Sequence, residues 1–467
     1  MAELTDSSPD AISESTDKIY NERSKDCPNN SSNLQASILK TCTEQPSERR
    51  HRLAKQILMA LGICLNFVNL GVTVAWTNPA SSDLKGEGHK TIYNGHIALV
   101  SSQMDLLGSL IAAGSLPGKW IAGWLTTRIG RKKSLIFTLF PNLLSWCLIF
   151  TAFSPDMIYA GRFIVGIGTG LTGVISSVYN IEIADIGIRG TVGVLPTAAL
   201  DMGFVIVACL GLLLNWYELC LAAMAMCVLA TIVAFFIPES PTYLVVSGKE
   251  NEARKVLNLL RGPHADIEQE IATLKTMNEG MTKKYGCGDL LKSSYIKSLL
   301  IILTLFLTQN FCGLGVLYSN ATRMLIESGS ALDENIATIL VFVFQLMGSV
   351  LSCIIMNRFR RKTLLVVSFL ICTVVLIIMG IHVYFNAQTD LLEYIQLNHT
   401  HIDNHEADEV MKMFPDDYNV NRVVEEKSYG WIPLVCLIAF VVGSNLGLRP
   451  IPFILNMEYF PTAIRPQ

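Results

Sequence analysis

The amino-acid sequence predicts an all-α membrane protein that is built from two parallel halves. Three observations lead to this fold class: an apolar composition, a series of long apolar runs, and a charged pattern that occurs twice. Of the 467 residues, 51% are hydrophobic and only 16% are charged, and the mean hydropathy is +0.41. Such a chain is too apolar for an ordinary soluble domain. Its net charge of −3 gives no indication of nucleic-acid binding.

Ten apolar runs have the length of about 20 residues that a helix needs to cross a bilayer. They are predicted at 54–76, 98–125, 134–153, 157–183, 191–214, 216–237, 297–321, 335–356, 363–386 and 429–456. The segment before the first run, 1–52, is rich in Ser, Asp, Glu and Asn and is predicted to be a disordered cytoplasmic tail. No signal-peptide cleavage site accompanies the first run, so we expect it to remain as a spanning helix.

These runs divide the chain into a first half of six helices at 53–237, a loop at 238–296 and a second half at 297–467. In the loop, apolar residues recur at helical spacing around Leu257, which predicts short cytoplasmic helices under the membrane domain. A solvated linker is the alternative. Four spans are present in the second half, which is therefore expected to be cut after its fourth helix. From this repeat we expect these 467 residues to insert into a membrane but to be inactive without two further helices. Sugar flux from the 467-residue chain would instead show that ten spans suffice.

Basic residues gather in alternate connections between the spans. They precede the first span at Arg49–Lys55, separate the second and third at Arg128–Lys133, and separate the eighth and ninth at Arg358–Lys362. The positive-inside rule then predicts a cytoplasmic N-terminus. The loop 387–428 falls outside, where the tripeptide beginning at Asn398 is a predicted glycosylation site.

One charged pattern occurs in both halves, with its basic clusters about 230 residues apart. The first copy is Arg128, Arg131, Glu182 and Arg189, and the second is Arg358, Arg361, Glu458 and Arg465. In each copy the Glu precedes the last Arg by seven residues. Charges at the membrane surface attract one another more strongly when a closing bundle excludes water, so we expect the glutamates to bind these arginines and to close an inner gate. The alternative is that the basic residues only set the orientation.

Six motifs in a fixed order extend this pattern from about residue 55 to the last residue. They are Gly123-x4-Arg128-x-Gly130-Arg131-Lys132, Arg162 twenty residues before Glu182, Arg189-Gly190, Pro238-Glu239-Ser240-Pro241, Gln309-Asn310-Phe311-Cys312-Gly313, and Pro450-Ile451-Pro452 before Glu458. This order resembles the sugar porter family of the major facilitator superfamily. Residues 189–197 and 259–262 look most like the insect facilitated trehalose transporters.

The resemblance implies the major facilitator fold, with two parallel six-helix halves, in a multi-pass protein of the plasma membrane. It also implies transport of a small neutral sugar, trehalose or glucose, by alternating access. The partners are then the sugar and the lipid bilayer, with no nucleic acid. The sequence shows no nucleophile–base or metal-ligand constellation, so we expect neither an enzyme nor a cofactor or metal.

Polar residues on apolar helices near the membrane midplane are the candidates for the sugar site, because they can form hydrogen bonds with hydroxyl groups. The candidates are Gln309, Asn310, Thr197 and Gln345, with Phe311 and Phe453 as apolar walls. Gln309 is the first choice, and each polar residue could instead serve helix packing. The family usually has Gln at Thr197, Asn at Gly315 and Trp at Phe453, and these departures suit a larger sugar or a wetter site.

Four charged residues are predicted within the membrane: Arg162, Asp105, Asp201 and Arg449. The first span contains no acidic residue, which favours uncoupled transport, although Asp105 and Asp201 leave a coupling role open. Arg449 replaces a glycine that is usual in the family, and a charge at that depth costs about 3 kcal/mol unless it meets water or an acid. We expect Arg449 to face the central cavity and to pair with Asp201. It could instead snorkel or contact the substrate.

At three further positions the sequence departs from the usual family pattern, which leaves a second function open. The family usually has an acid at Thr127 and Asn357 and a glycine at Arg360. Their loss weakens the expected inner gate. The alternative to a transporter is therefore a transporter-derived sugar sensor or a transport-inactive relative.

Overall fold

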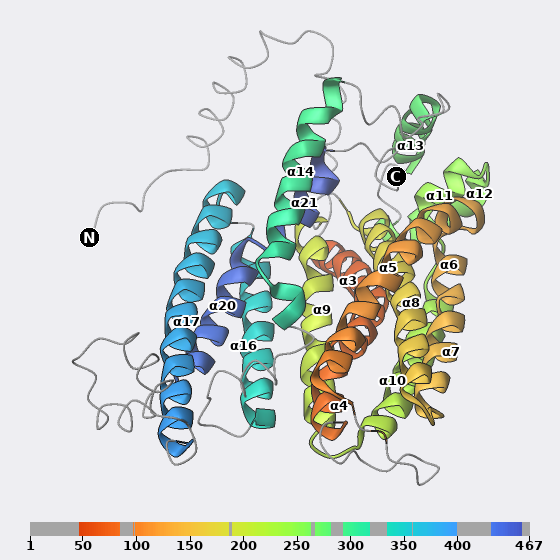
Figure 1. Ribbon diagram of the computed structural model, residues 1–467. Coiled ribbons are helices and arrows are strands. Elements are labelled where there is room, and N and C mark those ends of the chain that lie inside the picture. Colours follow the sequence, from red (N-terminus) through yellow and green to blue (C-terminus); the bar gives the residue numbers. More distant parts are fainter. Residues whose placement is uncertain are drawn as a thin grey trace, which may run out of the picture.

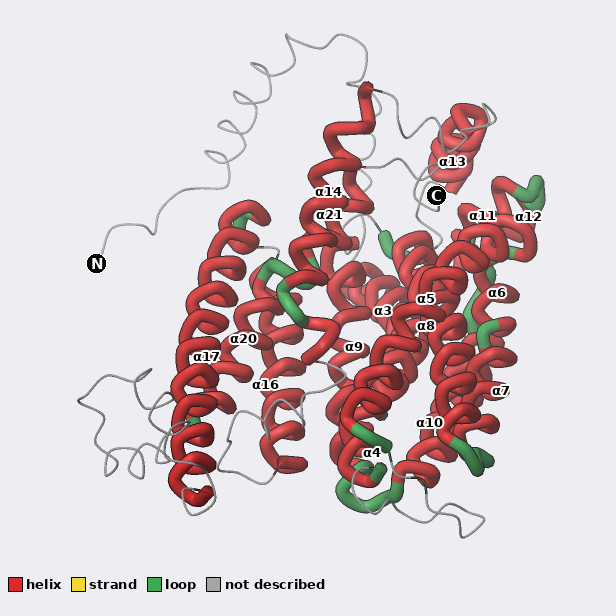
Figure 2. The backbone as a smooth tube through the Cα atoms, viewed as in Figure 1, coloured by secondary structure: helices red, strands yellow, loops and turns green. Residues whose placement is uncertain are grey.

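The computed structural model describes residues 46–84, 97, 99–185, 189–262, 267–281, 293–317, 334–356, 358–398 and 431–459. Within these ranges every regular element is a helix (Figures 1 and 2). The predicted disordered tail, apart from its end at 46–52, lies outside the described residues. The same holds for the loop after Asn398 and for Arg465.

The first half forms one bundle, and the second half lies beside it (Figure 1). The helices of the first half are α3 (Pro46–Ala75) with its continuation α4 (Thr77–Asp83), α5 (Ser101–Ile129), α6 (Arg131–Phe137), α7 (Leu139–Phe150), α8 (Pro155–Ile183), α9 (Arg189–Leu210) and α10 (Trp216–Phe236). The second half contains α14 (Ser293–Phe311), α16 (Glu334–Ile355), α17 (Arg361–Asn398), α20 (Ile432–Leu446) and α21 (Ile451–Tyr459). The halves meet where α9 packs against α16 and α21.

Each of the ten predicted spans is helical over most of its described part. Eight helices in these ranges are long and apolar enough to cross a membrane. The other two spans are α14, which is apolar over Ile296–Phe311, and α5, which is long enough but more polar than the rest. The ninth span continues as helix α17 through Asn398, so the first part of the expected outer loop is helical.

The tenth span is two helices instead of one. Its backbone leaves the helical conformation at 447–450, between α20 and α21. The hydroxyl of Ser368 on α17 donates a hydrogen bond to the carbonyl oxygen of Gly443 at 2.7 Å and accepts one from the N–H of Leu448 at 2.9 Å. Backbone polar groups at membrane depth need partners within the protein. Ser368 therefore supplies hydrogen bonds that a continuous helix would have made.

The described part of the loop between the halves contains three short helices, as its apolar spacing predicted. They are α11 (Pro241–Val246), α12 (Glu250–Arg261) and α13 (Ile267–Met281). On α12, Leu257 and Leu260 are fully buried. Arg261 Nη1 donates to the carbonyl oxygen of Ile183 at 3.1 Å, and Gln56 Nε2 donates to that of Leu260 at 2.8 Å. These contacts attach α12 to the ends of α3 and α8.

Glycines allow α5 and α8 to approach closely. A Cβ atom at Gly114 would overlap the carbonyl oxygen of Phe163, and one at Gly118 would overlap that of Ile167. On the facing helix, Gly166 leaves similar room for α5. Small residues four apart on both helices are the packing pattern of helix pairs within membranes. The α5–α8 pair is therefore a close-packed wall of the first half.

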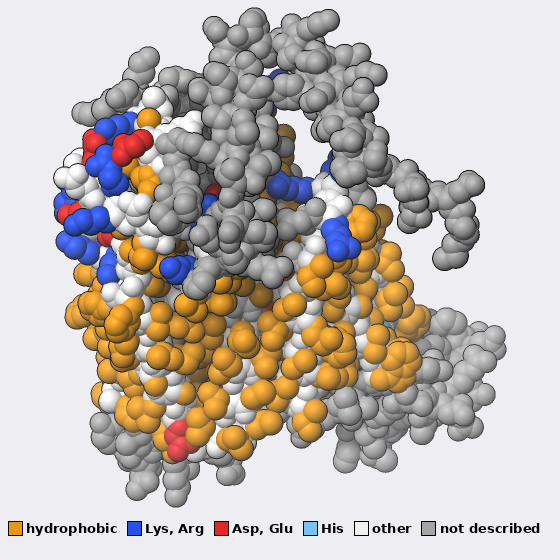
Figure 3. All heavy atoms as spheres, turned by 180° about the vertical axis from the view of Figure 1, so that it is seen from behind, with side chains coloured by type: hydrophobic (Ala, Val, Ile, Leu, Met, Phe, Trp, Pro, Cys, Tyr) orange, Lys and Arg blue, Asp and Glu red, His pale blue; other side chains and the backbone are white. Residues whose placement is uncertain are grey.

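The molecular surface has a broad apolar belt. In Figure 3 hydrophobic side chains cover the middle of the visible face, and lysines and arginines gather toward one end. This is the end at which α11, α12 and α13 lie in Figure 1. The belt is the expected surface of a protein whose helices contact lipid.

Candidate functional site

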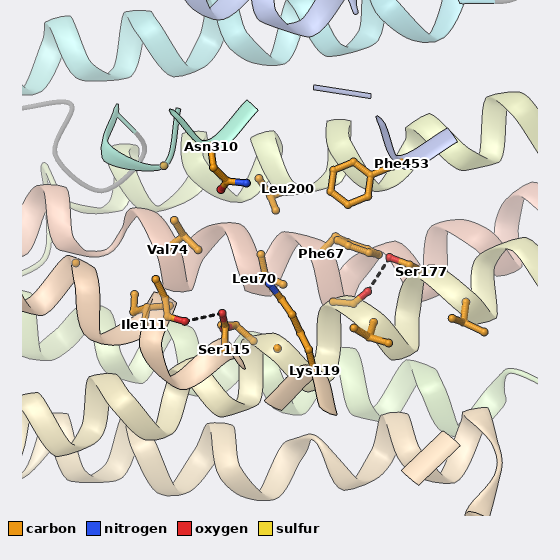
Figure 4. A pocket seen from close by; sticks show the side chains of 18 of the residues that line it. Phe67, Leu70, Val74, Ile111, Ser115, Lys119, Ser177, Leu200, Asn310 and Phe453 are labelled. Carbon is orange, nitrogen blue, oxygen red and sulfur yellow. Dashed lines mark hydrogen bonds between the residues drawn. The ribbon is translucent and has the colours of Figure 1, made fainter. Parts of the chain in front are cut away.

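A cavity of about 890 Å³ lies between the two halves. Its walls come from α3, α5, α8 and Leu200 of the first half and from the ends of α14 and α21 of the second. Its polar and charged lining residues are Asp105, Ser109, Ser115, Lys119, Arg131, Thr169, Ser177, Glu182 and Asn310. Figure 4 shows Asn310 and Phe453 on the side of the second half, facing Lys119, Leu70 and Phe67 across the cavity. The size and the mixed lining suit a small polar molecule with apolar faces.

Hydroxyl groups in the cavity offer acceptor oxygens. The hydroxyl of Ser115 donates to the carbonyl oxygen of Ala112 at 2.8 Å, and that of Ser177 to the carbonyl oxygen of Gly173 at 2.7 Å (Figure 4). The hydroxyl of Thr169 likewise donates to the carbonyl oxygen of Gly166 at 2.7 Å. Because these hydrogens are already used, the hydroxyl oxygens remain free to accept hydrogen bonds from a ligand.

Two of the predicted sugar-site residues line the cavity. Asn310 is exposed there, and its Nδ2 donates to the carbonyl oxygen of Phe306 at 2.7 Å. Phe453 is 48% exposed and forms an edge-to-face pair with Phe306, with ring centroids 5.1 Å apart. Aromatic side chains of this kind commonly form the apolar walls of ligand sites.

The other predicted sugar-site residues do not line this cavity. Gln309 is half-buried behind it, and its Nε2 donates to the carbonyl oxygen of Arg449 at 3.4 Å. Gln345 is fully buried, and Thr197 is half-buried on α9. Phe311 is 87% exposed and is not among the residues that line the cavity. The polar face of α5 contributes more of the wall than we expected.

A helical repeat in the sequence could have revealed this polar face. Its members lie four, ten and fourteen residues after Asp105, at Ser109, Ser115 and Lys119. These spacings place all four residues on one side of a helix. Ser109, Ser115 and Lys119 were not among the predicted site residues. Each of them, taken alone, is compatible with a helix that only packs against other helices. Their common face explains why α5 is less apolar than the other spans.

Asp201 and Arg449 form a buried ion pair between the halves. Arg449 Nη1 lies 2.6 Å from Asp201 Oδ1 and 2.8 Å from Oδ2. Gln345 Nε2 donates to Asp201 Oδ1 at 2.8 Å, and the hydroxyl of Ser349 donates to Oδ2. Asn445 Oδ1 accepts from Arg449 Nη1 at 3.1 Å. The expected contact between the two charges is therefore present.

The expectation that Arg449 faces the central cavity is wrong in this structure. Arg449 is 7% exposed, Asp201 is fully buried, and neither lines the cavity. The arginine is held away from it because its partners on α9 and α20 satisfy its charge within the helix interface. Desolvated charges persist only where such partners are in place.

At the end of the cavity nearest α6, Glu182 joins α8 to the connection between α5 and α6. Arg131 Nη2 lies 2.7 Å from Glu182 Oε1, and the hydroxyl of Ser240 donates to Oε2. A second carboxylate, Glu239, accepts from the backbone N–H groups of Arg131 at 2.8 Å and Lys132 at 2.9 Å through Oε1. These N–H groups open α6, where a negative charge is favourable.

Gly130 makes this arrangement possible. Its φ of 93° lies in a region that side-chain-bearing residues rarely adopt. A Cβ atom there would lie 2.7 Å from Glu239 Oε2 and 2.7 Å from a ring carbon of Tyr243. The glycine of the charged motif is therefore needed both for the turn and for the approach of Glu239.

Among the remaining members of the charged pattern whose side chains the structure describes, none contacts Glu182. Arg128 and Arg358 are exposed, and Arg361 is half-buried. The side chains of Arg189, Glu458 and Arg465, and all of Asn357, lie outside the described residues. All described partners of Glu182 belong to the first half or to the segment after it. A gate between the halves therefore stays a prediction.

Arg162 is a fully buried charge on α8 with neutral neighbours. Its Nη1 donates to the carbonyl oxygen of Thr73 at 3.1 Å, and its Nη2 donates to the hydroxyl of Thr77. The guanidinium lies over the ring of Trp76, 4.8 Å from the centroid. Among the described residues no carboxylate contacts Arg162. Its charge is stabilised by dipoles and by a cation–π contact.

Comparisons with known proteins agree on the family. The family described as "Sugar (and other) transporter" matches residues 55–402. The facilitated trehalose transporter Tret1 of Apis mellifera ligustica is 28% identical over 432 residues, which are 92% of this chain and 78% of that protein. Tret1 of Bombyx mori is 28% identical over 444 residues, with 92% of this chain and 79% of that protein covered.

Solved structures share the fold. The proton:xylose symporter XylE bound to 6-bromo-6-deoxy-D-glucose matches with a TM-score of 0.66 at 19% identity, covering 89% of this chain and 84% of that one. XylE from E. coli in a partially occluded inward-open conformation matches with a TM-score of 0.65 at 18% identity, covering 88% of this chain and 86% of that one. The chain thus has the major facilitator fold. Because the family match covers most of its length, the chain belongs to the sugar (and other) transporter family.

Proposed function

We propose that the protein carries a sugar across the plasma membrane, down its gradient, by alternating access. The observation that carries the proposal is the cavity between the two halves, which is lined by acceptor hydroxyls and an aromatic wall. Transporters of this architecture bind substrate between halves that move against each other. Trehalose and glucose are the first candidates, since the relatives from Apis and Bombyx are facilitated trehalose transporters.

Two observations support an uncoupled mechanism. The first span, 54–76, contains no Asp or Glu, and Arg162 behind it is satisfied by neutral groups. Of the acidic residues at membrane depth, Asp201 is held in an ion pair outside the cavity. Proton coupling requires a titratable acid in the pathway. Asp105 is then the residue on which coupling would depend.

Within the cavity, Asn310 binds sugar hydroxyls and Phe453 packs on the apolar face of the sugar ring. Support comes from their position on the wall of the second half, opposite the hydroxyls of α5 and α8 (Figure 4). The cavity lining does not include Gln309, Thr197 or Gln345. They reach a sugar only in another conformation of the transporter.

The charged end of the molecule faces the cytoplasm in this proposal. Lysines and arginines gather at the end that carries α11, α12 and α13, and cytoplasmic ends of membrane proteins are enriched in these residues. The N-terminus is then cytoplasmic. The predicted glycosylation at Asn398 follows from the same orientation, because α17 carries this residue to the other end.

The test is sugar flux in proteoliposomes that contain the purified full chain. Trehalose and glucose should equilibrate across the membrane, and a pH gradient should leave the final internal concentration unchanged. Accumulation above equilibrium that depends on the pH gradient would show proton coupling. An Asp105→Asn variant then tests whether this acid is responsible.

A sugar sensor or transport-inactive relative is the second candidate. One observation favours it: the buried Asp201–Arg449 pair joins the two halves directly. A desolvated pair resists separation, because each charge would be left without a partner. Saturable sugar binding without any flux in the same vesicles would select this candidate.

A further inference from the structure

Lys119 brings a positive charge into the cavity at membrane depth. It lies ten residues before the end of α5, which is about 15 Å along the helix axis. Its side chain is exposed in the cavity and extends toward Leu70 of α3 (Figure 4). Over the part of the chain that the structure describes, no hydrogen bond or ion pair engages its ammonium group. A neutral sugar has no need of such a charge.

The other charges of the cavity do not neutralise Lys119. Arg131 and Glu182 compensate each other at the end of the cavity nearest α6, 2.7 Å apart. Asp105 lies fourteen residues before Lys119 on the same helix, about 21 Å along the axis. That separation is more than twice the screening length of about 8 Å in physiological salt solution. The middle of the cavity is therefore locally positive.

Lys119 also complements the hydrogen-bonding groups around it. The oxygens of Ser115, Thr169 and Ser177 act as acceptors, since their hydrogens are used within their own helices. An ammonium group has three N–H donors and no acceptor. Hydrogen bonds from a cation to an anionic oxygen are about twice as strong as neutral ones. A ligand with both hydroxyl donors and an anionic oxygen would satisfy both kinds of group.

We propose that Lys119 makes the cavity a site for sugars that carry a carboxylate, such as a hexuronate. The carboxylate binds the ammonium group of Lys119, and the sugar hydroxyls donate to the oxygens of Ser115 and Ser177. This inference rests on the proposed function, because it takes the cavity as the sugar pathway. It extends the substrate class beyond trehalose and glucose.

The experiment compares uptake of labelled glucuronate and glucose by the full chain in proteoliposomes. The wild type should take up glucuronate in preference to glucose. Lys119→Met should reduce glucuronate uptake about tenfold or more, because it removes a charge-assisted hydrogen bond, and should change glucose uptake by less than about twofold. Lys119→Arg should retain most glucuronate uptake. Lys255→Met, which removes the same charge from the exposed surface of α12, should change neither.

Membrane potential provides an independent readout. A potassium diffusion potential that is positive inside should accelerate glucuronate uptake and leave glucose uptake unchanged, because only the carboxylate sugar carries charge. Glucose flux without binding or flux of glucuronate overturns the inference and leaves the proposed function intact. Equal losses of both fluxes in Lys119→Met also overturn it, since the lysine would then act on the protein alone. Absence of both fluxes in the wild type overturns the proposed function itself.

Discussion

The Asp201–Arg449 pair is placed where either charge alone would be costly. Both side chains are almost completely buried, and their partners come from α9, α16 and α20. Removing one member of such a pair typically costs about 3–5 kcal/mol, whereas replacing both together can be nearly neutral. A substitution at one of the two positions should therefore be tolerated only together with a matching substitution at the other.

We predict a large coupling energy between these positions. Asp201→Asn and Arg449→Gln should each lower the stability of the purified protein by about 3–5 kcal/mol, and the double variant should lose clearly less than the sum. Thermal unfolding in detergent measures the effect. The exposed pair Arg254–Glu268 on α12 and α13 provides the control. The same cycle there should give a coupling of no more than about 1 kcal/mol. Strict additivity at Asp201 and Arg449 would contradict the prediction.

At the scale of residues, the sequence predicted which two charged side chains contact each other, but not how deeply they are buried. The Asp201–Arg449 contact followed from helical rise and from the cost of an unpaired charge. Its burial did not follow, because the side chains that cover it, Gln345 and Ser349, come from a helix about 145 residues away. Lys119 was missed because a single lysine in a span resembles a snorkelling residue until the cavity is seen.

Among the helices, α5 and α8 show how small residues set the shape of the cavity wall. Gly118 and Gly170 bring the backbones together, so that the hydroxyls of Ser115 and Ser177 can both face the cavity. Without a hydrophobic driving force between helices in lipid, such close packing is a main source of their association. The loss of one glycine should therefore affect the fold and the site together.

We predict that Gly118→Ala lowers stability by about 1–3 kcal/mol, because the new methyl group overlaps the carbonyl oxygen of Ile167 and the helices must separate. Thermal unfolding in detergent is again the measurement. Gly380→Ala is the matched control, since Gly380 is also within a helix and a Cβ atom there meets nothing within 4 Å. That variant should be neutral or stabilised, as alanine favours helices. Equal effects of the two substitutions would argue against close packing at Gly118.

At this scale the sequence predicted which segments are helical but not where one span breaks. Run length and hydropathy predicted ten helical segments, and eight helices in the described residues are long and apolar enough to cross a membrane. Pro450 and Gly447 did signal an irregularity in the tenth span, yet proline and glycine are also tolerated in continuous transmembrane helices. Only the contact of Ser368 with both sides of the break distinguishes the two cases.

For the whole molecule, the basic side chains are concentrated at one end. Basic side chains lie at the end that carries α11, α12 and α13, and the apolar belt separates them from the opposite end (Figure 3). Composition and the repeat of charged motifs were enough to predict this arrangement. The position of the cavity was less predictable, because it depends on which faces of α5 and α8 are turned toward the second half.

We predict that both the N-terminus and the segment with α12 are cytoplasmic. An epitope inserted near residue 30, and another in the connection at 263–266, should bind antibody only after the cells are permeabilised. An epitope in 403–428 should bind in intact cells and serves as the positive control. Staining of the first two in intact cells would reverse the proposed orientation.

The break at 447–450 divides the tenth span into two helices that pack against different neighbours. α20 packs on α16 and α17, whereas α21 packs on α14 and touches α9 of the first half. When the halves move, a continuous helix would transmit the displacement along its whole length. Here a short length of backbone can bend instead, with Arg449 fixed to Asp201 beside it. A bend here would confine the conformational change to a short segment whose buried backbone groups are already hydrogen-bonded to Ser368.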